Sequence, residues 1–242
     1  MPQEIVDATS LFGFWASRTV DISLPRLLEI MDKYSIAKTA CVSTTGMFFD
    51  AEAGNDETWQ ATQAHPNLIP VATVDPRRYR GCAAEIERRA AQGFRMFSLF
   101  PETQGWEVDS ALFAGVRPAL SAAGRPVMIE ASDPGDPSRI ARAAEGTAFP
   151  IILAGINYRT LAEAIAIMKA DPRVHLETHS LTAVESIDLV AAEAGADRLL
   201  FGSYAPLNYT SSSLLMVQYC GLSDADKEVI LGGNLLRLLG AA

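Results

Sequence analysis

The stretch IILAGINYRTLAEAIAIMKADPRVHLE, residues 151–177, decides the fold. Its first four residues, Ile151–Ala154, are all apolar, which is typical of a strand buried on both faces of a parallel sheet. Thr160–Ala170 then carries apolar residues at helical spacing, and Val174–Glu177 is a second short strand candidate. The stretch therefore predicts one strand–helix–strand unit of a βα architecture.

The same alternation of short apolar runs and helix-like segments extends over the whole chain. Eight strands are predicted, at Ile5–Asp7, Thr39–Ser43, Ile69–Val74, Met96–Phe100, Val127–Glu130, Ile151–Ala154, Val174–Glu177 and Leu199–Phe201. Helices are predicted at Pro25–Tyr34, Gly81–Ala91, Thr160–Ala170 and Ala183–Ala194, and Ser223 is suited to cap a final helix. Eight such units in 242 residues, without a Pro-, Gly- or Ser-rich linker, predict a single α/β domain over residues 1–242, a (β/α)8 barrel.

The composition excludes several functional classes. Apolar residues make up 49% of the chain, and the net charge of −9 argues against nucleic acid or an anionic membrane as a main partner. No window approaches the roughly 20 apolar residues of a membrane helix, and the N-terminus lacks the pattern of a signal peptide. The three cysteines, Cys41, Cys82 and Cys220, suggest neither a disulfide framework nor a zinc motif. We therefore expect a cytoplasmic protein that acts on a small molecule.

Four stretches resemble the amidohydrolase-2 branch of the metal-dependent hydrolases. They are HPNLIPVATVDP at 65–76, GFRMFSLFPETQGWEVD at 93–109, GADRLLFGSYAP at 195–206 and EVILGGNLLRLLG at 228–240. With the strand order, the resemblance spans nearly the whole chain, and the last two stretches are the more specific. This branch includes decarboxylases, lactonases and hydratases of small carboxylated substrates. The resemblance implies a barrel whose active site lies at the carboxyl ends of its strands.

The resemblance also implies where metal ligands should lie, and this sequence departs from that pattern. The family's first strand ends in D-x-H-x-H, and Thr9 and Leu11 occupy the two histidine positions. The fifth and sixth strands usually end in histidine, where this chain has Glu130 and Gly155. The eighth usually ends in GSD-x-P, and here Tyr204 replaces the aspartate in GSYAP.

The family's metal set is therefore lost at these positions. A divalent metal needs imidazole and carboxylate ligands that converge on the ion, and Thr, Leu, Gly and Tyr do not supply them. We expect no metal and no other cofactor. A different site, formed by Glu130, Glu177 and His179, stays open as an alternative.

Three polar residues at predicted strand ends are the catalytic candidates. Partial burial of Glu130 would raise its pKa toward that of a general acid or base, although a salt bridge with an arginine is an equal alternative. His179 is either an acid or base near neutral pH or a hydrogen-bonded loop residue. Tyr204 either donates to a substrate oxygen or packs in the core with one partner for its hydroxyl.

Five further residues are predicted to contact the substrate: Thr9, Trp15, Arg18, Ser98 and Asn157. Trp15 and Arg18 lie in the long loop after the first strand, which can reach over the barrel mouth. Arginine is the usual partner of a substrate carboxylate, although most loop arginines are simply solvated. The apolar segment Met47-Phe48-Phe49 fits a pocket wall, a contact between copies in a homo-oligomer, or burial within one chain.

Two functions from different classes follow. The first is a metal-independent hydrolase or lyase, of lactonase or decarboxylase type, acting on a small oxygenated or carboxylated molecule. Glu130, His179 and Tyr204 would be its acid–base and oxyanion-binding groups. The second is a non-catalytic descendant that binds a ligand or a partner subunit, for which the loss of so many ligand positions argues. The polar residues kept at the strand ends favour the enzyme.

Overall fold

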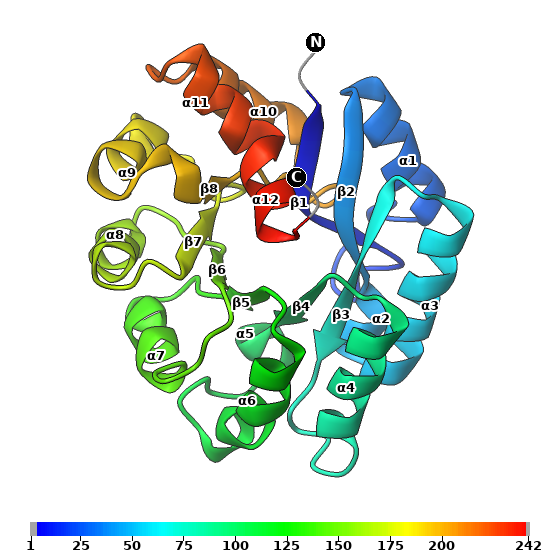
Figure 1. The fold of residues 1–242 in the computed structure, drawn as a ribbon. Coiled ribbons are helices and arrows are strands. Elements are labelled where there is room, and N and C mark those ends of the chain that lie inside the picture. The colour runs from blue at the N-terminus through cyan, green and yellow to red at the C-terminus, as the bar shows by residue number, and fades with distance from the viewer. Residues whose placement is uncertain (1–3, 241–242) are drawn as a thin grey trace.

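The computed structural model describes residues 4–240, and these form a (β/α)8 barrel, as the sequence predicts (Figure 1). Its parallel strands pair in chain order: β1 (Ile5–Phe12), β2 (Ile36–Ser43), β3 (Leu68–Val74), β4 (Met96–Leu99), β5 (Val127–Glu130), β6 (Ile151–Ala154), β7 (Val174–Glu177) and β8 (Leu199–Leu200). Backbone hydrogen bonds bring the segment after β8 back to β1. Ala8 N–H donates to the carbonyl of Phe201, and Leu11 N–H donates to that of Ala205, both at 2.8 Å.

Helices accompany the strands, and most of them form an outer ring (Figure 1). They are α1 (Leu24–Lys33), α2 (Thr44–Phe48), α3 (Ala51–Ala64), α4 (Cys82–Gln92), α5 (Pro101–Gln104), α6 (Ala111–Ala123), α7 (Asp136–Ala143), α8 (Leu161–Ala170), α9 (Ser186–Ala194), η1 (Ala196–Arg198), α10 (Thr210–Tyr219), α11 (Asp224–Glu228), the π-helical turn η2 (Val229–Gly233) and α12 (Asn234–Leu238). Ser223 caps α11 as predicted, because its hydroxyl accepts from Asp226 N–H at 3.1 Å.

The first strand is the clearest correction to the predicted boundaries. It was expected to end at Asp7, before the polar Thr9 and Ser10, but it continues to Phe12 with an irregular register between Asp7 and Ser10. Ser10 is tolerated there because its hydroxyl accepts from the Thr39 hydroxyl at 2.8 Å on the neighbouring strand. Polar residues in a buried strand need such partners, and a single sequence does not show them. Three strands match their predicted bounds, and the helix expected from Ala183 begins at Ser186.

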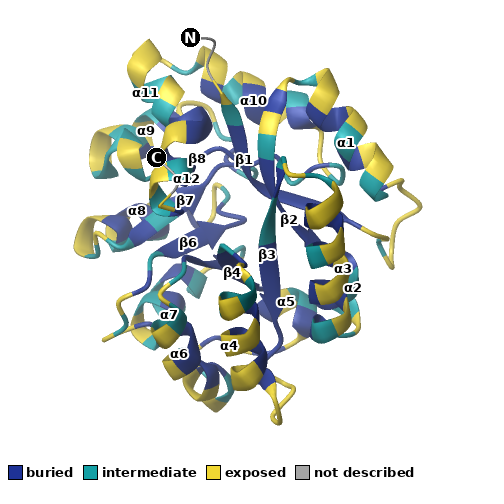
Figure 2. Cartoon of the chain, turned by 45° about the vertical axis from the view of Figure 1, so that its right-hand side comes forward, coloured by how far each residue is buried: buried dark blue, intermediate teal, exposed yellow. Residues whose placement is uncertain are grey.

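The core has two layers, one inside the barrel and one between the strands and the helices. Figure 2 shows the strands buried over most of their length and the helices exposed along their outer faces. Leu235 and Leu239 belong to the same cluster as Val6, Met96 and Met128, which line the barrel interior. In Figure 1, α12 lies at the centre of the ring of strands. The terminal segment thus closes the amino-terminal end of the barrel, and the carboxyl ends of the strands remain for a site.

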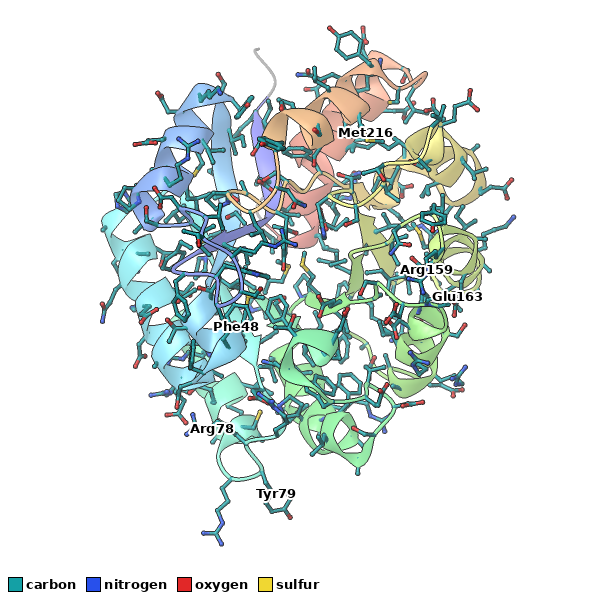
Figure 3. All side chains as sticks on the ribbon, turned by 180° about the vertical axis from the view of Figure 1, so that it is seen from behind. Phe48, Arg78, Tyr79, Arg159, Glu163 and Met216 are labelled. Carbon is teal, nitrogen blue, oxygen red and sulfur yellow. The ribbon has the colours of Figure 1, made fainter. Side chains whose placement is uncertain are left out.

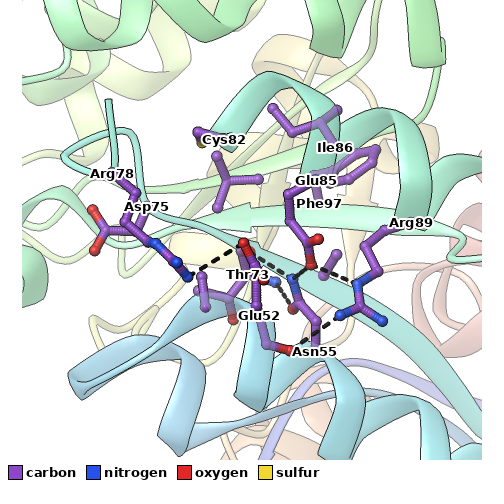
Figure 4. A pocket seen from close by; sticks show the side chains of 13 residues that line it. Glu52, Asn55, Thr73, Asp75, Arg78, Cys82, Glu85, Ile86, Arg89 and Phe97 are labelled. Carbon is purple, nitrogen blue, oxygen red and sulfur yellow. Dashed lines mark hydrogen bonds and ion pairs between the residues drawn. The ribbon is translucent and has the colours of Figure 1, made fainter. Parts of the chain in front are cut away.

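A charged network joins α3 and α4 outside the barrel (Figure 4). The amide of Asn55 accepts from Thr73 N–H at 2.7 Å and donates to the Thr73 carbonyl at 3.1 Å, so it completes the edge of β3. It also donates to Glu85 at 3.0 Å. Arg89, only 1% exposed, donates to Glu85, Gln92 and the Glu52 carbonyl. This network fixes the helices of the second and third βα units.

Among residues 4–240, no helix is long and apolar enough to cross a membrane. Cys41, Cys82 and Cys220 are free thiols. The cytoplasmic location and the homo-oligomeric state remain predictions from the sequence.

Candidate active site

A cavity of about 190 Å³ opens at the carboxyl ends of the strands. We call it the mouth cavity, and its lining residues are Thr9, Ser98, Phe100, Met128, Glu130, Ser132, Ala154, Gly155, Asn157, His179, Ser180 and Tyr204. They come from β1, β4, β5, β6 and the segments that follow β5 to β8. The barrel therefore gathers the ends of six strands around one space, which is the usual place for barrel chemistry.

His179 is held by a fully buried carboxylate at the end of β7. Its Nδ1–H donates to one oxygen of Glu177, and its backbone N–H donates to the other at 2.7 Å. Burial on its own would lower the pKa of His179, but the charge and hydrogen bond of Glu177 outweigh it and raise the pKa. The ring is therefore predisposed to be an imidazolium, with Nε2 left for a ligand.

Gly202 makes room for this pair. A Cβ atom at position 202 would lie 1.6 Å from Glu177 Oε1, which no side chain can share. The glycine of the GSYAP stretch therefore leaves space for the carboxylate that holds His179.

The ring of Tyr204 packs against the ring of His179. The two rings stack with centroids 4.6 Å apart and an interplanar angle of 14°. Burial raises the pKa of the Tyr204 hydroxyl far above its ordinary value, and the charges of Glu130 and Glu177 add to this. Tyr204 also has a φ of 54°, a left-handed conformation that is rare for a bulky residue and often found at functional sites. It is thus a neutral hydrogen-bond donor held in a constrained backbone.

A second buried acid, Asp7, lies behind the segment that carries Tyr204. It accepts from the N–H groups of Thr9 at 2.9 Å and Ser203 at 3.0 Å, and from the Ser203 hydroxyl. Burial raises the pKa of Asp7 to about 7 despite these bonds. Asp7 therefore ties β1 to the segment after β8, and its charge adds to the field that favours protonated His179.

Glu130 closes the wall supplied by β5. Burial, followed by the charge of Glu102, raises the pKa of Glu130 to about 7. Its contacts are weak, since Thr103 N–H and hydroxyl reach one oxygen at 3.4 and 3.5 Å. Among the described residues it makes no ion pair with Lys or Arg, so the salt-bridge alternative is not what holds it. A carboxyl group that titrates near neutrality suits proton transfer.

The structure brings six of the eight predicted site residues to the mouth cavity: Glu130, His179, Tyr204, Thr9, Ser98 and Asn157. Asn157 has little left to offer a ligand. Its amide donates to the Ser132 carbonyl at 2.8 Å and accepts from Arg159 N–H at 3.0 Å, so it braces the loop after β6.

Trp15 and Arg18 do not line the cavity. Trp15 lies behind it, with its ring centroid 6.5 Å from that of Tyr204 and 5.0 Å from that of Phe48. Arg18 is exposed in the loop after β1. Figure 3, seen from the side opposite to Figure 1, shows Phe48 on the inner side of the ring of helices. The segment expected to be a loop at 47–49 mostly belongs to α2.

Sequence reasoning missed Asp7 and Glu102 as parts of the site. Asp7 resembled the polar end of a strand, and Glu102 lies in the short helix α5. The one available signal was Asp7 itself, a carboxylate inside a strand otherwise predicted to be buried.

The fold resembles that of several solved enzymes. The 2,6-dihydroxybenzoate decarboxylase from Rhizobium aligns with a TM-score of 0.80 at 14% identity, covering 98% of this chain and 99% of that one. The 5-carboxyvanillate decarboxylase from Sphingomonas paucimobilis aligns with a TM-score of 0.74 at 15% identity, and the alignment covers 99% of this chain and 100% of that one. A dihydroxybenzoic acid decarboxylase from Polaromonas sp. JS666 aligns with a TM-score of 0.80 at 16% identity, and the alignment covers 98% of this chain and 97% of that one. That structure was solved with manganese and 2-nitroresorcinol. No curated protein sequence matches this chain.

The residues of this chain do not fit the metal of that last neighbour. Leu11 is buried in the barrel interior, and Gly155 and Tyr204 carry neither imidazole nor carboxylate. Both oxygens of Glu177 are taken by His179. Within residues 4–240, no three His, Cys, Asp or Glu side chains are placed to hold a metal ion, so the alternative site of Glu130, Glu177 and His179 is not formed.

The sequence itself gives the last comparison. The family model described as amidohydrolase matches residues 23–241, nearly the whole barrel. Despite the divergence of its strand ends, the chain belongs to the amidohydrolase family.

Proposed function

We propose that this protein is a metal-independent lyase of decarboxylase type that acts on a small carboxylated aromatic molecule. The observation that carries the proposal is the single cavity lined by Glu130, His179 and Tyr204, in which His179 Nε2 and the Tyr204 hydroxyl form no hydrogen bond with the described residues. The family and the substrates named for its structural neighbours support this class.

His179 and Tyr204 bind the anionic part of the substrate. The imidazolium, kept charged by Glu177, pairs with a carboxylate or phenolate oxygen through Nε2. The neutral Tyr204 hydroxyl donates a second hydrogen bond. Ser98, which is buried and forms no side-chain hydrogen bond with the described residues, adds a hydroxyl from β4.

Glu130 is the general acid. Its proton forms a new C–H bond at the ring carbon that bears the carboxylate. The C–C bond to that carboxylate then breaks, its electron pair returns to the ring, and CO2 leaves. Glu130 is left as a carboxylate and regains its proton from water. Because the pKa of Glu130 is about 7, the acid form is available at neutral pH without a large cost.

The proposal is tested by CO2 release from a panel of hydroxybenzoates, measured with chelator present throughout. Glu130→Gln should lower kcat by about 10²–10⁴-fold, and Tyr204→Phe by about 10-fold or more, with both variants folded. Glu107→Gln is the matched control, because that side chain is 74% exposed and lies outside the mouth cavity. Turnover that needs added manganese, or that survives Glu130→Gln, would contradict the assignment.

A second candidate is a non-catalytic protein that binds a carboxylated ligand. Leu11 and Gly155 favour it, since both stand at family ligand positions without any polar side chain. Such a protein would turn over no member of the panel, yet a bound hydroxybenzoate would raise its Tm.

A further inference from the structure

Reciprocal hydrogen bonds join α5 to the end of β5. Thr103 donates to Glu130 from its backbone and its hydroxyl, and the Ser132 hydroxyl donates to Glu102 at 2.6 Å. Each segment thus holds the carboxylate of the other. Asn157 keeps Ser132 in place through its carbonyl, at 2.8 Å. The exchange brings two carboxylates from different βα units to one wall.

Glu102 and Glu130 both line a second cavity of about 100 Å³, which we call the side cavity. Its arginine, Arg139, binds Asp136 and approaches Glu107 at 4.0 Å. Among the described residues, neither Glu102 nor Glu130 forms an ion pair with a Lys or Arg. Because Arg139 is bound to Asp136 and not to either of these residues, the negative charge of Glu102 disfavours ionisation of Glu130.

Glu130 belongs to both cavities, whereas His179 and Tyr204 line the mouth cavity alone. A substrate in the mouth cavity would cover one side of the Glu130 carboxyl group. Its other side faces the side cavity, where protons reach it without passing the substrate. The carboxylate pair therefore lies between the reaction space and the solvent.

We propose that Glu102 is a positioning residue that keeps the proton on Glu130 between turnovers. The inference rests on the proposed function, in which Glu130 is the general acid. After Glu130 has given its proton to the substrate, a proton from water replaces it, and the negative charge of Glu102 holds it there. Ser132 and Thr103 keep the carboxylates adjacent while this happens.

The other charges around Glu130 do not replace Glu102. His179, in the segment after β7, favours the ionised form of Glu130. Glu177, at the end of β7, is bonded to His179. From the segment after β5 and from α7, Asp133, Asp136 and Arg139 line the side cavity. Of the neighbouring charges, Glu102 is the leading one that raises the pKa of Glu130.

The first test needs no substrate. The carboxyl carbon of Glu130 is titrated by NMR in the full-length protein, with its signal assigned from Glu130→Gln. Glu102→Gln should lower its midpoint by about 1 pH unit, Glu102→Asp should largely restore it, and Glu107→Gln in the same cavity should leave it unchanged. An unmoved midpoint in Glu102→Gln, or an equal shift in Glu107→Gln, would overturn the inference.

The second test follows the pH profile of kcat. If the titration midpoint of Glu130 falls from about 7 to about 6, the protonated fraction of Glu130 falls roughly fivefold at pH 7 and stays the same near pH 5. The kcat of Glu102→Gln should therefore be about fivefold lower than that of wild type at pH 7 and equal to it near pH 5. A structural defect would lower kcat at every pH. If Glu130→Gln keeps full turnover, the proposed function fails. If Glu130→Gln is inactive but Glu102→Gln shifts neither titration nor profile, only this inference fails.

Discussion

The network between α3 and α4 and the wall of the mouth cavity bury charged groups in opposite ways. At Glu85, burial would raise the pKa, but hydrogen bonds from Arg89, Asn55 and Arg88 outweigh it and lower the pKa (Figure 4). At Glu130, burial and a like charge raise the pKa to about 7. A buried charge whose atoms are all paired supports structure, whereas a buried acid with weak partners can exchange its proton.

The largest expected effect separates the two regions by stability. Arg89→Met should lower the free energy of unfolding by about 3–5 kcal/mol, because it removes the buried guanidinium from Glu85 Oε1, which then keeps only the Asn55 amide as a partner. Arg88→Met, the control, removes a side chain that is 53% exposed and should cost about 1 kcal/mol or less. Urea unfolding measures both. An equal cost for the two variants would mean that the network is not a buried one.

The pH dependence of stability should report on Glu130 in the mouth cavity. Glu130 titrates near pH 7 in the folded chain and near 4.5 when unfolded, so the folded state binds this proton more tightly. Its contribution to stability is full below about pH 4.5 and is lost as the pH rises through 7. Relative to wild type, Glu130→Gln should therefore be about 3 kcal/mol more stable at pH 8 than at pH 4.

Chemical denaturation at the two pH values measures this difference. Glu107→Gln should show none, because that side chain is exposed. A Glu130→Gln curve parallel to wild type would show that folding does not raise the pKa of Glu130.

A smaller effect probes how tightly the mouth is packed. Gly202→Ala should cost about 1–3 kcal/mol, because its Cβ displaces Glu177 from His179. The imidazole signals of His179 should move toward a lower pKa. Gly115→Ala in α6 meets no atom within 4 Å and should be neutral or slightly stabilising. Unchanged His179 titration in Gly202→Ala would show that Glu177 has room to move.

The strand ends show how far sequence reasoning reaches. Three strands have the predicted bounds: Val127–Glu130, Ile151–Ala154 and Val174–Glu177. In a βα architecture, a short apolar run between two helical segments forms a buried strand. Glu130, His179 and Tyr204 could be assigned to the mouth because each follows or ends such a run. Their catalytic roles stay predictions.

The sequence by itself determined the barrel and six of the polar residues at its mouth, because periodicity and strand order depend on neighbours along the chain. Only the tertiary structure decided which polar groups are paired. The partners of Asp7 and Glu130 come from segments that the fold brings together, as in the bond from Ser203 to Asp7 across 196 positions. Burial and pairing set a proton affinity, and both are properties of the folded arrangement.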